Sequence, residues 1–314
     1  MLRHITKIID LSHQDLDDLV ESARRFHARY NEGIRRDDRL GGRVVALVFE
    51  KPSLRTKVSF EAATMFLGGN PIFLSSEQIF SSGGNQYGRE SVSDIARNLE
   101  RFCDIIVARV FQHETIRALA STVDVPVVNA LCDLHHPSQA ITDVITMEGK
   151  AVKGGKRLKV AYIGDGNNVA TSLSQACAMR GHDVVVASPA GYEVPAIEQA
   201  VACELRRTTD QEILFIQDPE KAVGDADVLY TDTFVSMGQE SERQKRLNDF
   251  EGYQVNGALM RKAPSHAVFM HCLPAHRGEE VTDEVMDSKQ SIVFDQAESR
   301  LYVATAVLAW CLRL

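Results

Sequence analysis

The sequence of 314 residues contains no apolar run approaching the roughly 18–20 residues that a membrane-spanning helix needs. Its N-terminus shows no signal-peptide pattern. The 20 glycines and nine prolines are too few and too scattered for a disordered or fibrous chain. Basic residues are not in excess, because the net charge is −8, which argues against general nucleic-acid binding. A local basic pocket for an anion is compatible with this balance.

Cysteine pairs are missing as well, because none of the six cysteines belongs to a CxxC motif. No Cys/His spacing supports a closed metal site, so we predict no metal. We expect five cysteines to be small buried hydrophobic residues of a protein in the reducing cytoplasm. These five are Cys103, Cys132, Cys177, Cys203 and Cys311. Cys272 is the exception, because it lies in a motif that directly follows an apolar strand.

The pattern that is present is an alternation of strands and helices. Apolar, β-branched runs predict strands at residues 43–49, 105–110, 125–131, 158–163, 184–187, 213–216, 228–231, 267–270 and 292–294. Helical spacing predicts helices at 12–29, from about 57 to 68, at 137–147, from 168 to 179 and at 301–314. Such an alternation is typical of α/β proteins with parallel sheets covered on both faces, and the length suits two domains. A glycine-rich stretch at 148–156 looks like the boundary.

Two polar motifs follow strands in the first half of the chain. Ser53, Arg55 and Thr56 lie where a strand gives way to a helix. The amides of a helix N-terminus favour an anion there, and hydroxyl and guanidinium groups can donate to it. The alternative is a capped helix with solvated basic residues. His136 and Gln139 lie at a second such junction and can both donate to one carbonyl oxygen; the alternative is a capped helix with an exposed histidine.

The second half carries four further candidates. Residues 164–169 resemble a dinucleotide-binding loop, but Val169 replaces its third glycine, which weakens that interpretation. Asn167 and Asn168 either cap the next helix or hold a substrate carboxylate. Asp232, at a strand end, suits an ammonium ligand or caps a turn.

Cys272 and Arg300 complete these candidates. After its strand, Cys272 is a nucleophile, a proton handler, a polar wall or simply a buried residue. Arg300 begins the last helical stretch, where an arginine is usually solvated, but it could return to the site of the first motif.

The four motifs at 53–56, 136–139, 232–238 and 271–274 together resemble the ornithine carbamoyltransferases, of the aspartate/ornithine carbamoyltransferase superfamily. Their order and spacing fit nearly the whole chain. The resemblance implies two doubly wound α/β domains with the active site in the cleft between them. The first binds carbamoyl phosphate and spans 1–148 together with the C-terminal helix at 299–314, which returns to it. The second binds ornithine and spans 149–298.

The resemblance also implies roles for individual residues. Carbamoyl phosphate is expected to contact Ser53, Leu54, Arg55, Thr56, Gln86, Arg109, His136, Pro137, Ser138, Gln139, Cys272, Leu273 and Arg300. Ornithine is expected to contact Asn168, Asp232, Ser236 and Met237. The residues implied in catalysis are Arg55, Arg109, His136, Asp232 and Cys272. Gln86 would come from a neighbouring subunit of a homotrimer. The sequence departs from the family pattern at two positions. Leu54 stands where Thr is commoner, and Lys57 stands where Arg is usual, which keeps the positive charge but loses the bidentate guanidinium.

The implied reaction is transfer of the carbamoyl group to the side-chain amine of L-ornithine in arginine metabolism, giving L-citrulline and phosphate. The amine attacks directly, no covalent enzyme intermediate is needed, and no metal or organic cofactor is implied. The partners are therefore two small molecules and other copies of the chain, with no nucleic acid and no membrane. Three alternatives are a dinucleotide-dependent oxidoreductase, a catalytically silent sensor, and a sibling transferase for putrescine or an acetylated amino acid. The sequence leaves open whether the role is anabolic or catabolic.

Overall fold

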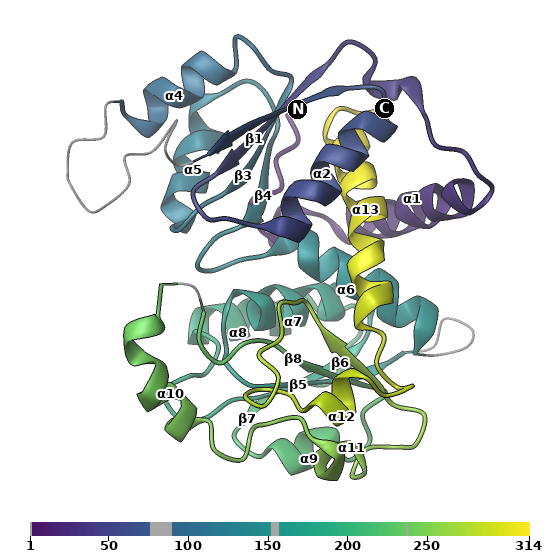
Figure 1. Cartoon of the computed structure of the whole chain (residues 1–314), viewed down its shortest axis with the longest axis vertical. Helices are drawn as coiled ribbons and strands as arrows, with labels where there is room; N and C mark the ends of the chain where they lie inside the picture. The colour runs from purple at the N-terminus through teal and green to yellow at the C-terminus, as the bar shows by residue number, and fades with distance from the viewer. Residues whose placement is uncertain (1, 76–89, 152–156, 237) are drawn as a thin grey trace. The chain divides into compact units, whose positions relative to one another are not determined.

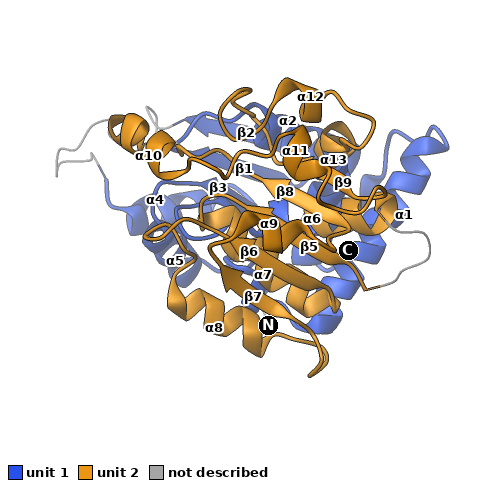
Figure 2. Cartoon of the chain, turned by 90° about the horizontal axis from the view of Figure 1, so that it is seen from below, with its two compact units in different colours: residues 1–142, 299–314 blue, residues 143–298 orange. Residues whose placement is uncertain are grey.

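The computed structural model describes residues 2–75, 90–151, 157–236 and 238–314. The chain divides into two compact units, residues 1–142 with 299–314, and residues 143–298 (Figure 2). Within the described ranges no helix is long and apolar enough to cross a membrane.

Unit 1 is built on a four-stranded sheet of order β2-β1-β3-β4, and every neighbouring pair is parallel. Its strands are β1 (Val44–Phe49), β2 (Asn70–Ser75), β3 (Ile105–Arg109) and β4 (Val127–Leu131). Its helical segments are η1 (Ile8–Asp10), α1 (His13–Asn31), η2 (Asp38–Leu40), α2 (Leu54–Phe66), α4 (Val92–Leu99), α5 (His113–Thr122) and the first part of α6 (Pro137–Lys150). The apolar residues of β1, β3 and β4 are almost all buried, as expected for a sheet covered on both faces.

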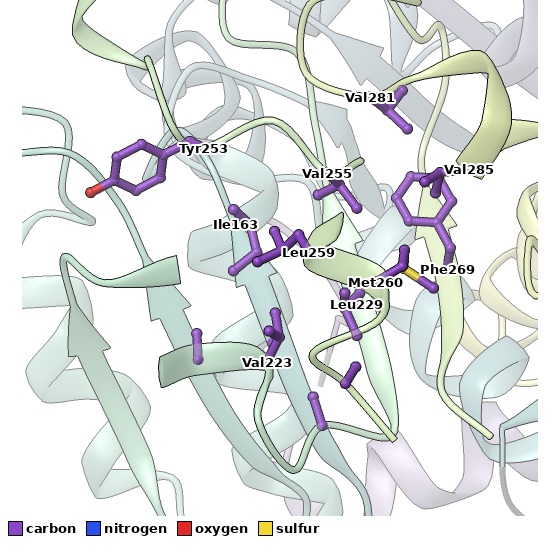
Figure 3. Packing of buried hydrophobic residues seen from close by; sticks show 14 of the residues in the cluster. Ile163, Val223, Leu229, Tyr253, Val255, Leu259, Met260, Phe269, Val281 and Val285 are labelled. Atoms are coloured by element: carbon purple, nitrogen blue, oxygen red, sulfur yellow. The ribbon is translucent and has the colours of Figure 1, made fainter. Parts of the chain in front are cut away.

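Unit 2 is built on a five-stranded parallel sheet of order β7-β6-β5-β8-β9. The strands are β5 (Lys159–Ile163), β6 (Asp183–Ala187), β7 (Ile213–Ile216), β8 (Val228–Thr231) and β9 (Val268–His271). The helices are α7 (Asn168–Arg180), α8 (Ala196–Glu204), α9 (Pro219–Val223), η3 (Glu240–Glu242), α10 (Arg243–Asp249), α11 (Gly257–Met260) and α12 (Asp283–Met286). One face of this sheet packs an apolar core that joins strand residues such as Leu229 to Leu259 and Met260 of α11 (Figure 3).

The helix starts show how far local chemistry fixes these elements. Ser12 and Asp15 form the reciprocal capping box that opens α1. α2 begins at Leu54, earlier than the predicted start near residue 57, because the Ser53 hydroxyl accepts a hydrogen bond from the Thr56 amide and caps the helix there.

The C-terminal helix α13 (Val293–Cys311) corrects one strand prediction. Residues 292–294 are not a strand: the Ile292 amide donates one hydrogen bond to the Phe269 carbonyl, and the Gln296 amide then donates to the Ile292 carbonyl, which starts the helix. The return to the first domain is confirmed, because residues 299–314 belong to unit 1. Helix α13 lies beside α1 (Figure 1), and the His27 ring of α1 stacks on Tyr302 of α13, with ring centroids 4.4 Å apart.

None of the six cysteines, all of them within the described residues, forms a disulfide. Cys103, Cys132, Cys177 and Cys311 are buried as predicted. Cys203 is only partly buried, because it lies on α8, whose other face is in solvent.

Candidate functional sites in the two units

The polar motifs of unit 1 gather at one edge of its sheet. β1, β3 and β4 are parallel, so their carboxyl ends share that edge. β1 leads to Ser53 and α2, β3 ends at Arg109, and β4 leads to His136 just before α6. Ligands of α/β sheets bind at this edge, so the topology itself brings the predicted residues together.

Ser53 and Leu54 form the start of α2. The Ser53 side chain is the N-cap, 3.3 Å from the Thr56 amide, so the capping alternative describes what it does in this structure. Leu54 is 73% exposed, which fits a residue that contributes through its backbone rather than its side chain. Arg55 is half-buried in the first turn of the same helix.

Two arginines meet at the hydroxyl of Thr56. Arg300 Nη2 donates to Thr56 Oγ1 at 2.6 Å, and Arg109 Nη1 lies 3.4 Å from the same oxygen. Arg300 also donates to the side-chain oxygen of Gln139. Both acceptors are neutral, so these bonds orient the guanidinium without cancelling its charge. Arg109, Arg300 and Thr56 are all buried, which makes this a strongly electropositive place.

His136 lies in the same environment. Burial lowers the pKa of His136 well below its usual range, and the charges of Arg300 and Arg109 lower it further. The imidazole is therefore neutral near pH 7, and it can donate a hydrogen bond without adding a positive charge. Pro137 and Ser138 follow it as the first, buried residues of α6.

Two lysines behave differently from one another. Lys57 Nζ lies 3.8 Å from the centre of the Phe73 ring and 3.9 Å from Glu61, so its charge is engaged along α2. Lys51 is buried, and its pKa is lowered by burial and by the charge of Arg109. Sequence reasoning did not select Lys51 as a site residue, although its place directly before the Ser53 motif was the available signal.

The site of unit 2 centres on Asp232, at the end of β8. Cys272 Sγ donates to Asp232 Oδ1 at 3.0 Å, and Asn167 Nδ2 donates to Oδ2 at 2.9 Å. The Asn167 side-chain oxygen meanwhile accepts from the amides of Val169 and Ala170, so this residue is the cap of α7. Asn168 is the first residue of that helix and is half-buried.

The glycines of the loop before α7 are explained by packing. A Cβ on Gly166 would lie 2.1 Å from the backbone nitrogen of Val194, and Gly164 has a φ of +135°. Both positions therefore need glycine for the fold of the loop itself. This removes the main sequence argument for a dinucleotide.

A buried ion pair supports the loop after Asp232. Arg246 of α10 donates to Asp165 and, at 2.6 Å, to the carbonyl of Phe234. Burial raises the pKa of Asp165 to about 7, in spite of the opposing charge of Arg246. Ser236 in this loop is half-buried, and its amide donates to Gln239 at 3.1 Å. No sequence signal pointed to Arg246, because its partner lies 81 residues away.

Among the residues that the structure describes, two groups of side chains have the spacing of metal ligands. One joins Asp232, His271 and Cys272, but both ring nitrogens of His271 are already engaged, with the Leu273 amide and with Glu280. The other joins His276, Glu279 and Glu280, and Glu279 is paired with Arg243. Neither group offers a good cation site. Two predicted contacts, Gln86 and Met237, lie outside the described residues.

The two units match two family models. Residues 3–149 match the "Aspartate/ornithine carbamoyltransferase, carbamoyl-P binding domain", and residues 156–311 match the "Aspartate/ornithine carbamoyltransferase, Asp/Orn binding domain". The chain belongs to the aspartate/ornithine carbamoyltransferase family.

Relatives named ornithine carbamoyltransferase are similar to nearly the whole chain. An ornithine carbamoyltransferase of Thermus thermophilus is 48% identical over 96% of this chain and 92% of its own, and one of Bacillus subtilis is 46% identical over 95% and 90%. The structure of ornithine carbamoyltransferase from Pyrococcus furiosus superposes with a TM-score of 0.91 at 43% identity, covering 98% of this chain and 96% of that one. The anabolic enzyme of Campylobacter jejuni gives 0.90 at 34% identity, covering 99% of both chains.

Proposed function

We propose that this chain transfers the carbamoyl group of carbamoyl phosphate to the side-chain amine of L-ornithine, giving L-citrulline and phosphate. The similarity to enzymes named ornithine carbamoyltransferase over nearly the full length supports this activity. The observation that carries it within the molecule is that one unit holds a cationic site and the other unit holds an anionic site. Two similar relatives are named anabolic, which favours a role in arginine biosynthesis.

In this proposal the cationic site of unit 1 binds carbamoyl phosphate. The phosphate is bound by the first turn of α2 and its backbone amides, which belong to Ser53, Leu54, Arg55 and Thr56. Arg109 and Arg300 supply buried positive charge for phosphate and for the oxyanion. The remaining contacts of this ligand are proposed to be His136, Pro137, Ser138, Gln139, Cys272 and Leu273, with Gln86 donated by a neighbouring subunit.

The anionic site of unit 2 binds ornithine. Asp232 pairs with the α-ammonium, and Asn168, at the start of α7, hydrogen-bonds the α-carboxylate. Ser236 and Met237 complete the contacts. The Cys272 thiol donates a hydrogen bond to Asp232, and its sulfur lone pairs can accept one from the attacking amine, so that Cys272 orients the amine rather than attacking itself.

The chemistry is a direct acyl transfer. The neutral amine nitrogen attacks the carbonyl carbon, a C–N bond forms, the C–O bond to phosphate breaks, and phosphate leaves with the electron pair. The attacking nitrogen gives up one proton, and the departing phosphate, which takes the electron pair, is the base that accepts it. Positive charge and the neutral His136 donor stabilise the developing oxyanion, and removal of one such donor typically costs about 10²–10³ in rate. The donor is already activated, so the proposal includes no metal or organic cofactor.

We also propose that the chain works as a homotrimer, or an assembly of trimers, in the cytoplasm. Leu54, Val58 and Met65 are 73%, 52% and 60% exposed and share one face of α2, which leaves an apolar stripe for a second copy. Sedimentation of wild type and of Met65→Asp tests this point, and a wild-type monomer would contradict it. The domain boundary at 148/149 stays a prediction.

The function is tested by citrulline formation from carbamoyl phosphate and a panel of amines. Ornithine should react, whereas lysine, putrescine and acetylated ornithine should all react poorly. Putrescine lacks the groups that Asp232 and Asn168 would bind, and leaving polar partners bare can cost more than the roughly 1–3 kcal/mol of a missing methylene. Preference for putrescine, or no citrulline at all, would contradict the proposal.

A further inference from the structure

Glu280 is buried beneath the amino-acid site and has no part in the proposed chemistry. Its side chain is 0% exposed, and so is that of His271, the last residue of β9. His271 Nε2 lies 3.2 Å from Glu280 Oε1. A carboxylate enclosed at such depth in an enzyme's core is costly, unless its hydrogen bonds compensate for the lost water.

The hydrogen bonds of His271 fix its tautomer. The amide of Leu273 donates to His271 Nδ1 at 2.9 Å, so Nδ1 carries no proton. The proton of the neutral ring is therefore on Nε2, which donates a hydrogen bond to Glu280. Without that acceptor the ring could turn or change tautomer, and Nδ1 would no longer be presented to Leu273.

The Leu273 amide is part of the peptide plane that joins Cys272 to Leu273. Because the peptide group is planar, anchoring the N–H on His271 also sets the direction of the Cys272 carbonyl. Leu273 has a φ of +60°, which a leucine rarely adopts and which needs the surrounding bonds to hold it. The same turn presents the Cys272 thiol to Asp232.

Glu280 reaches the opposite loop of the site by a second route. Its Oε1 also accepts a hydrogen bond from the backbone amide of His276. The ring of His276 in turn lies 3.0 Å from the hydroxyl of Thr233, the residue next to Asp232. One carboxylate thus joins the loop of Cys272 to the loop of Asp232.

We propose that Glu280 is a positioning residue of the amino-acid site: through His271 it holds the turn that carries Cys272 and Leu273, and through His276 it holds the loop of Asp232. Its effect on turnover rests on the proposed function, whereas its effect on the His271 tautomer does not. Small displacements are expensive here, because misplacing a reacting group by about 1 Å can cost around 10²-fold in rate.

The first test compares Glu280→Gln, Glu280→Ala and the neighbouring control Glu279→Ala, whose residue pairs with Arg243 near the surface. The glutamine oxygen can accept the same two bonds, so Glu280→Gln should keep kcat within about threefold, whereas Glu280→Ala should lower it by about tenfold or more. Glu279→Ala should resemble wild type. Equal loss in both alanine variants, or none in Glu280→Ala, would overturn the proposal.

The second test remains decisive if Glu280→Ala does not fold. In His271→Asn the amide oxygen can take the place of Nδ1 and accept from Leu273, whereas in His271→Phe only the ring shape is kept. The proposal expects kcat of the asparagine variant to exceed that of the phenylalanine variant by about tenfold, since only it restores the peptide anchor. A purely space-filling role predicts the reverse order and would overturn it.

The third test does not depend on turnover. In protein labelled with ¹⁵N-histidine, the signals of His271, assigned by their loss in His271→Asn, should show the Nε2-protonated tautomer in wild type and Glu279→Ala. Glu280→Ala should show a mixture. If wild type shows the proton on Nδ1, the positioning proposal fails even if citrulline forms. If no citrulline forms but the tautomer is as expected, the proposed function fails and the hydrogen-bond arrangement stands.

Discussion

The two sites use the same local architecture for opposite charges. Each lies where a parallel strand leads into a capped helix, with Ser53 as the cap in unit 1 and Asn167 in unit 2. In unit 1 two buried guanidinium groups meet at Thr56, in the first turn after the cap, whereas in unit 2 the cap itself donates to the buried carboxylate of Asp232. The scaffold therefore supplies position, and the side chains at the strand ends decide whether an anion or an ammonium is bound.

The two caps also differ in what they support. The Ser53 hydroxyl accepts a hydrogen bond from one backbone amide. The Asn167 side chain accepts hydrogen bonds from two backbone amides and also donates one to Asp232. In unit 2 the loop geometry and the charge of the site are thus tied by one side chain. Substitutions in the two sites should therefore have separable effects on turnover, substrate preference and stability.

Arg300→Ala should have the largest effect. It removes a buried cation that donates to Thr56 and Gln139, and we expect kcat to fall by about 10²–10³. Arg300→Lys keeps the positive charge but not the bidentate guanidinium, so it should recover part of the lost turnover. Steady-state citrulline formation measures both. Unchanged turnover in a folded Arg300→Ala variant would remove the cationic site from the mechanism.

Asp232→Asn should act on the other site. It removes the charge that pairs with the α-ammonium, and charge-assisted bonds are worth roughly 1.5–3 kcal/mol, so kcat/KM for ornithine should fall by about 10- to 150-fold. The residual rate with putrescine, which lacks the α-substituents, should barely change. If both substrates lose equally, Asp232 acts on something other than the amino-acid backbone.

The pH profile distinguishes the amine from the protein. The ornithine side-chain amine should resemble lysine, with a pKa near ~10.4, so its neutral fraction rises about tenfold per pH unit. At subsaturating ornithine the rate should therefore rise from pH 7 to 8.5. Burial, Arg300 and Arg109 lower the pKa of His136 well below this window, so His136 adds no step there.

Asp165 is the control for that profile, because burial raises its pKa to about 7 and it faces both Arg246 and Asp232. The slope should survive in Asp165→Asn. A flat profile in wild type, with chemistry shown to be rate-limiting, would contradict direct attack by the amine.

The caps should show the smallest effects, and on stability rather than charge. Ser53→Ala should lower the free energy of unfolding by about 0.5–1 kcal/mol, since one N-cap bond is lost. Asn167→Ala should cost about 1–3 kcal/mol, because two amides and Asp232 lose their partner. Urea denaturation at one fixed protein concentration compares them. Equal losses in the free energy of unfolding would show that the two caps contribute equally to stability and would contradict this prediction.

The sequence predicted most of this arrangement where a local signal existed. Apolar strands and the polar residues after them, such as Ser53 and Asp232, indicated both sheets and both sites, whereas Arg109, inside a predicted strand, was implied only by the family resemblance. Residues 292–294 were wrongly predicted as a strand because their apolar, β-branched composition is a local signal. The hydrogen bond from the Ile292 amide to Phe269, after which the helix begins, joins residues far apart in the sequence and leaves no such signal. Arg246 and Glu280 escaped for the same reason: their roles depend on contacts that only the folded chain brings together.

Direct binding of carbamoyl phosphate tests the division of labour between the two sites. Calorimetric titration of wild type, Arg55→Ala and Asp232→Asn, without ornithine, isolates the first substrate. We expect Arg55→Ala to weaken binding by about tenfold or more, since each charge-assisted bond is worth roughly 1.5–3 kcal/mol, and Asp232→Asn to leave the affinity unchanged. Unchanged affinity in a folded Arg55→Ala variant, or an equal loss in Asp232→Asn, would contradict it.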